Sequence, residues 1–211
     1  MIAIVDSGVA NLGSVEAAFR RIGIQGRVTA DGRAVRCAAA VLLPGVGSFA
    51  DAMATLRERQ LVEPIRAAAA DGVPVMGICL GMQLLAEQSE EFGCHEGLGL
   101  IPGRVVRLNP SRPSERVPNI GWCDVTPAPD AALYREVACG TAFYFVHSYH
   151  LDCCDPADVA ATIRFGGGTV AAAVQRGNVH GAQFHPEKSQ DGGLAVLAAF
   201  AALARVRGAH A

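Results

Sequence analysis

Short apolar runs of strand length alternate with longer amphipathic segments through the first half of this sequence. The apolar runs span residues 2–6, 39–43 and 74–78, and patterns with helical spacing span residues 14–22, 48–60, 64–72 and 80–89. Runs this short and this continuously apolar are typical of strands that are covered on both faces. Because a helix follows each strand, the pattern predicts a doubly wound α/β fold with a mostly parallel central sheet and helices on both faces.

The sequence beyond Gly99 has a different pattern. Strand-like runs separated by turn residues span residues 103–108, 122–126, 143–148, 159–165, 169–175 and 179–184. They predict additional antiparallel strands in the C-terminal half, with a hairpin turn at Gly166-Gly167-Gly168. A last helix is expected over residues 192–206, and residues 109–118 are expected to form a mobile loop. With 211 residues, no repeat and no long linker, we expect a single domain over residues 1–211.

Composition excludes several classes of protein. The formal charge is −2, without the basic surplus of proteins that bind nucleic acid through its phosphates. No apolar run reaches the roughly 20 residues that span a bilayer, and Asp6 follows too soon for a signal peptide. The seven cysteines are irregularly spaced and form no zinc-type cluster. We therefore expect a reduced, cytoplasmic protein that binds neither membrane nor nucleic acid and uses no metal or cofactor.

The sharpest local signal is Gly77-Ile78-Cys79-Leu80-Gly81, at the junction of an expected strand and an expected helix. This is the setting of a nucleophile elbow, in which a strained turn lifts the nucleophile out of the sheet between small residues. The N-terminus of the following helix favours the thiolate, which is the reactive form of cysteine. On this segment alone, a buried strand cysteine between chance glycines is an equal alternative.

A catalytic thiolate needs an acid–base partner, and His185 is the best placed of the six histidines. It lies in Phe184-His185-Pro186-Glu187, after an expected strand and before a helix. Glu187 could reach back to orient the imidazole and fix its tautomer. Alone, these residues would fit an ordinary helix entry with an early acidic residue. Together with Cys79 they predict a triad of nucleophile, base and orienting residue in the order Cys–His–Glu.

Pro44-Gly45-Val46-Gly47 follows another expected strand. Its glycines allow backbone N–H groups to point into a cavity, as an oxyanion hole requires. The N–H group of Val46 or Gly47 would be one donor, and that of Leu80, directly after the nucleophile, the other. Taken alone, an ordinary glycine turn explains this segment better, so its assignment depends on the triad.

Three segments occur in a fixed order along the chain: Pro-Gly-Val-Gly at 44–47, Gly-Ile-Cys-Leu-Gly-Met-Gln at 77–83 and His-Pro-Glu-Lys-Ser at 185–189. In this combination the sequence resembles the class I, or triad, glutamine amidotransferases over essentially its whole length. Within that family it is particularly similar to the glutaminase subunits of imidazole glycerol phosphate synthase. That similarity rests on residues 44–49, on Asn119-Ile120-Gly121-Trp122 and on residues 144–149.

The resemblance implies a reaction and assigns residues to it. Cys79 would attack glutamine, His185 would act as base and acid, and Glu187 would orient the imidazole, releasing ammonia and then glutamate through a γ-glutamyl thioester. The positions that match the glutamine pocket of the family are Gln83, Glu91, Tyr144 and Ser148, and those that match the partner interface are Lys188, Trp122 and Asn11.

The resemblance also implies a partner. A chain of this length has no room for a domain that binds the ammonia acceptor. The ammonia would pass through a closed route to a cyclase subunit with a (β/α)8-barrel fold. The two chains would form a heterodimer that makes imidazole glycerol phosphate and AICAR in histidine biosynthesis, with allosteric activation of the glutaminase.

Lysine use draws attention to Lys188, which is the only lysine among the 18 Lys and Arg residues. A compact ammonium is not interchangeable with a planar guanidinium in a tight contact, so a role at the interface would explain its presence.

Three positions depart from the family pattern. Ser7 stands where an aromatic residue is usual, Ala10 where Gly is common and Cys123 where Asn is usual. These departures concern the first loop and the expected interface and leave the triad intact.

Three other functions are compatible with parts of this pattern. Another amidotransferase of the same fold, serving anthranilate, aminodeoxychorismate or pyridoxal phosphate synthesis, would usually carry a different oxyanion loop. A stand-alone cysteine hydrolase would be fully active without a partner. A non-catalytic binding module would be expected to lack Cys79, His185 or Glu187, and all three are present.

Overall fold

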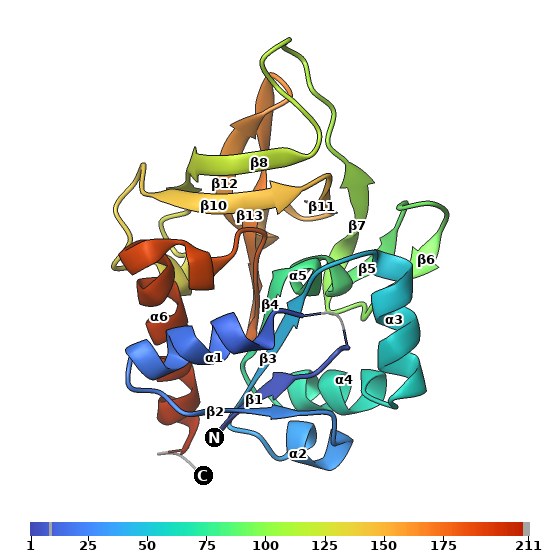
Figure 1. The fold of residues 1–211 in the computed structure, drawn as a ribbon, viewed down its shortest axis with the longest axis vertical. Helices are drawn as coiled ribbons and strands as arrows, with labels where there is room; N and C mark the ends of the chain where they lie inside the picture. The colour runs from blue at the N-terminus through green and yellow to red at the C-terminus, as the bar shows by residue number, and fades with distance from the viewer. Residues whose placement is uncertain (9, 209–211) are drawn as a thin grey trace.

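The computed structural model of the chain describes residues 1–8 and 10–208, with side chains up to residue 205 (Figure 1). Residues 9 and 209–211 of the predicted domain lie outside that description. The strands are β1 (Ile2–Val5), β2 (Gly26–Thr29), β3 (Ala40–Gly45), β4 (Val75–Cys79), β5 (Ala86–Ser89), β6 (His95–Glu96), β7 (Ile101–Arg107), β8 (Asn119–Asp124), β9 (Thr126–Pro127), β10 (Ala142–His147), β11 (Tyr149–Cys153), β12 (Val159–Phe165), β13 (Gly168–Arg176) and β14 (Val179–Ala182). The helices are α1 (Leu12–Arg21), α2 (Gly32–Arg36), α3 (Phe49–Glu58), α4 (Val62–Ala70), α5 (Leu80–Leu84) and α6 (Gln190–Gly208), with short 3-10 helices η1 (Ala132–Tyr134), η2 (Pro156–Asp158) and η3 (Pro186–Lys188).

The central sheet is eight-stranded, in the order β2-β1-β3-β4-β14-β13-β12-β9. Neighbours from β2 to β14 run parallel, and neighbours from β14 to β9 run antiparallel. The winding reverses at β1, because the chain moves outward to β2 and then crosses back to β3 on the other side. Two smaller sheets, β10-β8 and β11-β7-β5-β6, complete the fold. The doubly wound α/β class expected from the alternation of strands and helices is confirmed.

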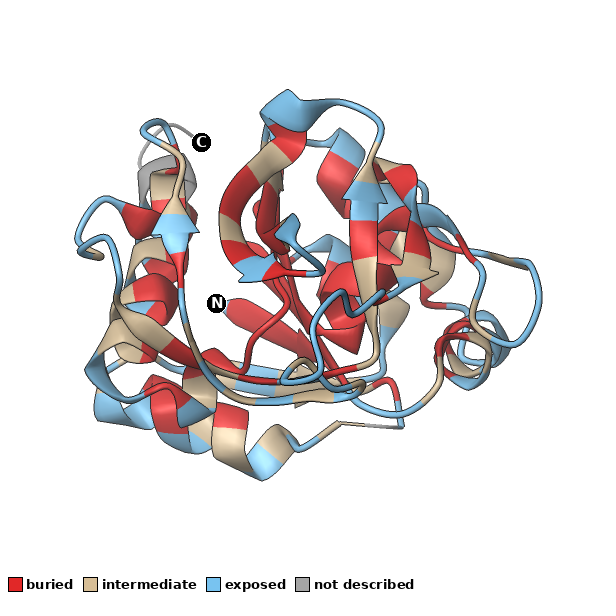
Figure 2. Cartoon of the chain, turned by 90° about the horizontal axis from the view of Figure 1, so that it is seen from above, coloured by how far each residue is buried: buried red, intermediate tan, exposed pale blue. Residues whose placement is uncertain are grey.

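The central sheet is covered on both faces, because successive residues of a strand point to opposite sides. Ile2 and Ile4 of β1 pack in the core formed with α1 and α6, whereas Ala3 and Val5 pack in the core formed with α2, α3, α4 and α5. Figure 1 shows α1 and α6 on the left and α3 and α4 on the right. Buried residues concentrate on the strands between these helices (Figure 2).

The carboxyl ends of the parallel strands meet at one edge of the sheet. Gly45 at the end of β3 lies in register with Cys79 at the end of β4, and β14 ends three residues before His185. In open α/β sheets, ligands and functional side chains gather at this edge. The topology therefore brings together the three segments that the sequence singled out.

The two-stranded sheet β10-β8 lies beside the same edge (Figure 1). It presents an apolar face to solvent. Tyr144 pairs with Trp122, and Val146 pairs with Ile120, so these four side chains point to one side. Ile120, Trp122 and Val146 are 61%, 49% and 36% exposed. We call these four residues the apolar face of β8-β10.

The helix expected over residues 80–89 is wrong in its second half. α5 ends at Leu84, and Ala86–Ser89 forms β5, which pairs in parallel with β7 and antiparallel with β6. The backbone N–H of Gly99 donates to the carbonyl of Ala86. Pairing with strands that come later in the chain thus overrides the local helical pattern.

Several elements were not expected from the sequence. β2 lies at the edge of the central sheet and reads Gly-Arg-Val-Thr, with no buried residue, so it lacks the apolar signal of a strand. The short helix α2 and strands β6, β9 and β11 were also missed.

The hairpin at Gly166-Gly167-Gly168 is confirmed, since Phe165 pairs with Gly168. Residues 109–118 form the expected loop, and its mobility stays a prediction. Among the described residues, no helix is long and apolar enough to cross a membrane.

Candidate active site

Cys79 lies at a strained turn between β4 and α5. Its backbone angles, φ 55° and ψ −111°, are in a region that side-chain-bearing residues rarely adopt. A Cβ at Gly77 would collide with the backbone of Gly81, and a Cβ at Gly81 would collide with the carbonyl of Leu43. The glycines two positions on either side of Cys79 are therefore required by close backbone approach, which is the geometry of a nucleophile elbow.

His185 and Glu187 form a buried pair beside this turn. His185 Nδ1 lies 2.8 Å from Glu187 Oε1, and the two side chains are 4% and 2% exposed. Burial by itself would lower the pKa of His185, but contacts with Cys79 and Glu187 raise it to about 9. Cys79 and Glu187 together therefore hold the imidazole in its protonated form at neutral pH.

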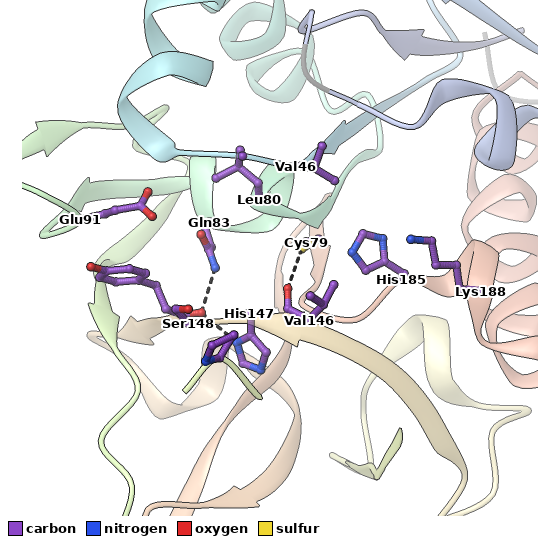
Figure 3. Close-up of a pocket in the computed structure, with 13 residues that line it drawn as sticks. Val46, Cys79, Leu80, Gln83, Glu91, Val146, His147, Ser148, His185 and Lys188 are labelled. Carbon is purple, nitrogen blue, oxygen red and sulfur yellow. Dashed lines mark hydrogen bonds between the residues drawn. The ribbon is translucent and has the colours of Figure 1, made fainter. Parts of the chain in front are cut away.

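The second ring nitrogen, His185 Nε2, is buried and has no hydrogen-bond partner in the described part of the chain. Figure 3 shows the imidazole beside Cys79 at one end of a cavity. The Cys79 sulfur lies 3.9 Å from the carbonyl oxygen of Val146 and 3.9 Å from the side-chain nitrogen of Gln183. A buried ring nitrogen without a partner is costly, which fits a group that exchanges protons during a reaction.

The cavity in front of Cys79 has a volume of about 380 Å³ and could hold a small amino acid. Nine of the sequence-predicted residues line it: Val46, Gly47, Cys79, Leu80, Gln83, Glu91, Ser148, His185 and Lys188. These residues come from the segment after β3, the end of β4, α5, the segment after β5, the junction of β10 and β11, and the segment after β14. The fold thus brings most of the predicted site into one cavity (Figure 3).

The glycine segment after β3 forms one wall of this cavity. Val46 and Gly47 are exposed, and Gly47 has φ +100°, a conformation that favours glycine. Leu80 lines the same cavity as the first residue of α5, where helix N–H groups have no partner within the helix. The three backbone N–H groups assigned to an oxyanion hole therefore belong to residues on one cavity, and their role stays a prediction.

Gln83 and Glu91 are held in place by hydrogen bonds to the backbone. Gln83 Nε2 donates to the carbonyl of Tyr149 at 2.9 Å, and the carboxylate of Glu91 accepts from the N–H of Phe49 at 2.6 Å. Phe49 is the first residue of α3, so Glu91 lies at the positive end of that helix. Both side chains are oriented without a ligand.

Comparison with known proteins decides the family. The family described as glutamine amidotransferase class-I matches residues 3–202 of this chain. The chain belongs to the class I glutamine amidotransferases. Among curated members, this amidotransferase is 46% identical over 202 residues to the imidazole glycerol phosphate synthase subunit HisH of Rhodopirellula baltica, covering 95% of this chain and 97% of the relative. It is 47% identical over 207 residues to HisH of Moorella thermoacetica, covering 98% and 97%. The resemblance stated from the motifs is confirmed.

Solved structures confirm the fold of this amidotransferase. A crystal structure of a glutamine amidotransferase matches with a TM-score of 0.75 and 20% identity, covering 97% of this chain and 98% of that one. The structure of PurLQS from Thermotoga maritima matches with a TM-score of 0.71 and 19% identity, covering 95% and 97%.

Tyr144 is not among the residues that line the cavity of the amidotransferase, although it was assigned to the glutamine pocket. Its ring packs edge-on against Trp122, with 6.0 Å between centroids, and Lys188 Nζ lies 6.0 Å from its ring centroid. Val146, two residues further along β10, takes the place at the cavity wall. Two strand residues span almost 7 Å, which carries Tyr144 out of the cavity to the apolar face of β8-β10.

Asn11 and the departures from the family pattern lie around the site. Asn11 is exposed and caps α1 by accepting from the N–H of Ser14, and it borders a small crevice behind the glycine segment, not the cavity itself. Ser7 is fully buried, and its hydroxyl donates to the carbonyl of Pro44 at 3.4 Å. Cys123 lies on β8, 3.7 Å from the side-chain nitrogen of Asn119. Ala10 shows no contact that explains it.

The cavity also contains residues that sequence reasoning did not assign to it: Pro118, Val146, His147 and Tyr149. Val146, His147 and Tyr149 belong to residues 144–149, whose similarity to the family was noted from the sequence, but only Tyr144 and Ser148 of that segment were assigned to the pocket. In the described part of the chain, no three His, Cys, Asp or Glu side chains cluster closely enough to hold a metal ion.

Proposed function

We propose that this amidotransferase is the glutaminase subunit of imidazole glycerol phosphate synthase, acting in the cytoplasm in histidine biosynthesis. It hydrolyses L-glutamine and passes the ammonia to a cyclase subunit that makes imidazole glycerol phosphate and AICAR. The observation that carries the proposal is the buried His185–Glu187 pair beside the Cys79 elbow, in a chain similar to HisH subunits over nearly its full length.

The reaction begins with attack of the Cys79 thiolate on the side-chain amide carbon of glutamine. The N–H groups of Leu80 and of Val46 or Gly47 stabilise the oxyanion of the tetrahedral intermediate. The raised pKa of His185 keeps the imidazole protonated at neutral pH, so it can give its proton to the departing ammonia. Breakage of the C–N bond leaves a γ-glutamyl thioester and a neutral imidazole.

Hydrolysis of the thioester restores the starting state. The neutral His185 takes a proton from a water molecule as the water oxygen attacks the thioester carbon. Collapse of the second tetrahedral intermediate breaks the C–S bond and releases glutamate. The sulfur leaves as thiolate and the imidazole is again protonated, so the pair needs no further proton for the next cycle.

Glutamine binds in the cavity with its side-chain amide towards Cys79. Gln83, Glu91 and Ser148 face the rest of the substrate from the cavity wall. The carboxylate of Glu91 suits the positively charged α-ammonium group of an amino acid. Its hydrogen bond from the backbone of Phe49 holds it ready for that contact.

The partner is a (β/α)8-barrel cyclase subunit, and the two chains form a heterodimer that channels ammonia. The apolar face of β8-β10 supports this interface, because Ile120 and Trp122 are large, exposed and adjacent. Lys188 lines the cavity and also lies over Tyr144 of that face, so it connects the reaction site with the docking surface. Asn11 lies on the α1 side of the triad and completes the set of interface residues.

Docking also explains how the glutaminase is activated. The glycine segment with Val46 and Gly47 is exposed in this chain, so its N–H groups can be set in place by the partner. We expect weak glutaminase activity of the isolated chain and a sharp rise with the cyclase subunit and its ligand. Equal turnover with and without the partner would contradict this and favour a stand-alone cysteine hydrolase.

A pull-down of the tagged chain from an extract of its own cells tests the partner directly, with bound proteins identified by mass. We expect a (β/α)8-barrel cyclase to be the main protein recovered in stoichiometric amount. The Trp122→Asp variant should no longer recover this cyclase. Recovery of an anthranilate, aminodeoxychorismate or pyridoxal phosphate synthase subunit instead would assign the glutaminase to another pathway.

A further inference from the structure

Gln183 has a buried amide that the mechanism above does not use. It directly follows β14, its side chain is fully buried, and its backbone N–H donates to the carbonyl of Ala172 at 2.9 Å. One end of the side-chain amide lies 3.0 Å from Gln83, and the other end lies 3.9 Å from the Cys79 sulfur. Gln183 does not line the cavity itself, but its amide contacts both the nucleophile and Gln83, which does.

The carbonyl oxygen of Tyr149 fixes the orientation of this amide. A carbonyl can only accept, so the Gln83 atom 2.9 Å from it belongs to the NH2 group. The second N–H of that group points at Gln183, whose nearer atom is therefore the oxygen Oε1. The NH2 group of Gln183 is left on the side of the sulfur.

His147 holds the same carbonyl from another direction. Its Nδ1 lies 2.8 Å from the oxygen of Tyr149, and its Nε2 lies 3.1 Å from the side-chain nitrogen of Asn119. Burial lowers the pKa of His147 to about 4, so the ring is neutral and carries one N–H, which must be on Nδ1. The carbonyl of Tyr149 therefore accepts hydrogen bonds from both His147 and Gln83. These bonds fix the orientation of the Gln83 amide and, through it, that of the Gln183 amide.

The sulfur has a different partner in each protonation state. As a thiol it can donate to the carbonyl of Val146, 3.9 Å away. As a thiolate it can only accept, so this carbonyl ceases to be a partner, and the N–H of Gln183 stabilises the sulfur together with the protonated His185. A buried anion without a donor carries a large desolvation cost, which a fixed N–H offsets.

We propose that Gln183 is a positioning residue for the reaction: its side-chain N–H, fixed by Gln83, holds the Cys79 sulfur and stabilises the thiolate. The inference rests on the proposed role of Cys79 as the nucleophile. It gives a positioning role to the side chain of Gln183, which belongs neither to the triad nor to the wall of the cavity that faces glutamine.

The test is the pH profile of Cys79 alkylation by iodoacetamide in the purified chain, followed by mass on the peptide that contains Cys79. Gln183→Met removes the N–H at similar volume, and Gln183→Glu removes it while keeping an acceptor for Gln83. Both variants should shift the midpoint of the profile upward by about one pH unit, which lowers the rate about tenfold below the midpoint. The control is Gln175→Met on the neighbouring strand β13, which breaks the hydrogen bond from the N–H of Ala132 in η1 and should leave the midpoint unchanged.

A second measurement uses the wild-type chain, in case the variants do not fold as judged by circular dichroism. In the chain labelled with 15N-glutamine, the side-chain amide signal of Gln183 should move with the alkylation midpoint, and the same signal should be independent of pH in Cys79→Ala. The role of Gln183 is contradicted if Gln183→Met folds and keeps the wild-type midpoint, or if the Gln183 signal does not change when Cys79 ionises. Either result leaves the assignment of Cys79 as nucleophile intact. Glutaminase activity that survives Cys79→Ala overturns the nucleophile assignment and this inference with it.

Discussion

His185 Nδ1 lies 2.8 Å from Glu187 Oε1, and both side chains are almost completely buried. Glu187→Gln keeps the shape of the side chain but removes the charge that helps to raise the pKa of His185. We expect glutamine hydrolysis in the assembled enzyme to fall by about 10²–10⁴-fold, because orientation and charge of the base are both affected. An NMR titration should show the pKa of His185 below its wild-type value of about 9. Glu63→Gln, at an exposed pair with Arg66, is the control and should leave both quantities unchanged.

Gly81 approaches the backbone of β3 so closely that no side chain fits. Gly81→Ala should lower the free energy of unfolding by about 3 kcal/mol or more, because the added Cβ collides with the rigid carbonyl of Leu43. Gly13→Ala, in the first turn of α1 with open space around it, is the control and should be neutral or stabilising by up to about 1 kcal/mol. Urea unfolding of both variants checks the prediction. Similar stabilities would show that the elbow is not closely packed.

His180 is buried in β14, and its Nδ1 has no hydrogen-bond partner among the described residues. Burial lowers the pKa of His180 from 6.5 to about 4. Between these two pH values the unfolded chain binds more protons than the folded chain, so the free energy of unfolding falls as the pH falls, by about 1.4 kcal/mol per pH unit for each such histidine.

Replacement of His180 isolates this contribution from that of His147 and the carboxylates. His180→Phe should reduce the slope of the free energy of unfolding against pH between pH 6.5 and 4, whatever its effect on stability at pH 7. The slope is measured by urea unfolding at a series of pH values. A variant with the wild-type slope would mean that His180 is not held neutral by burial.

Lys188 Nζ lies 6.0 Å from the ring centroid of Tyr144, at the border between cavity and apolar face. Lys188→Arg should lower glutamine-dependent synthesis relative to ammonium-dependent synthesis several-fold, because a planar guanidinium does not reproduce the contacts of a compact ammonium. The temperature of unfolding should change little, since the side chain is exposed. Arg20→Lys, the reverse exchange at an exposed position of α1, should affect neither ratio nor stability. If Lys188→Arg left the ratio of glutamine-dependent to ammonium-dependent synthesis unchanged, the single lysine would have no role at the interface and would reflect amino-acid composition alone.

The chemistry of the site was largely predictable because the residues that carry it lie close together within short segments of the sequence. Gly77, Cys79 and Gly81 indicated an elbow, and the structure shows close backbone approach at both glycines. The contact of Glu187 with His185 spans two residues, so it could be anticipated from their spacing. Strands with continuous apolar runs, such as β3 and β4, were recognisable for the same reason.

What escaped prediction depends on partners distant in sequence. β5 has a helical pattern and becomes a strand only because β7 pairs with it. β2 carries no apolar run, because it lies at a sheet edge. Tyr144 and Val146 are equivalent as strand residues, and only their distance from the end of β4 decides which one reaches the cavity. A role for the amide of Gln183 could not be predicted from the sequence, because it depends on contacts with Gln83 and Cys79 that only the folded chain makes.

In the proposed function, Cys79 produces ammonia for a reaction that another subunit carries out. The most direct measurement compares glutamine-dependent and ammonium-dependent synthesis of imidazole glycerol phosphate by the complex of Cys79→Ala with the cyclase, with the exposed Cys139→Ala as control. We expect glutamine-dependent synthesis to be abolished in Cys79→Ala, while ammonium-dependent synthesis stays at the wild-type rate. Loss of both reactions, or glutamine-dependent synthesis that persists without Cys79, would contradict it.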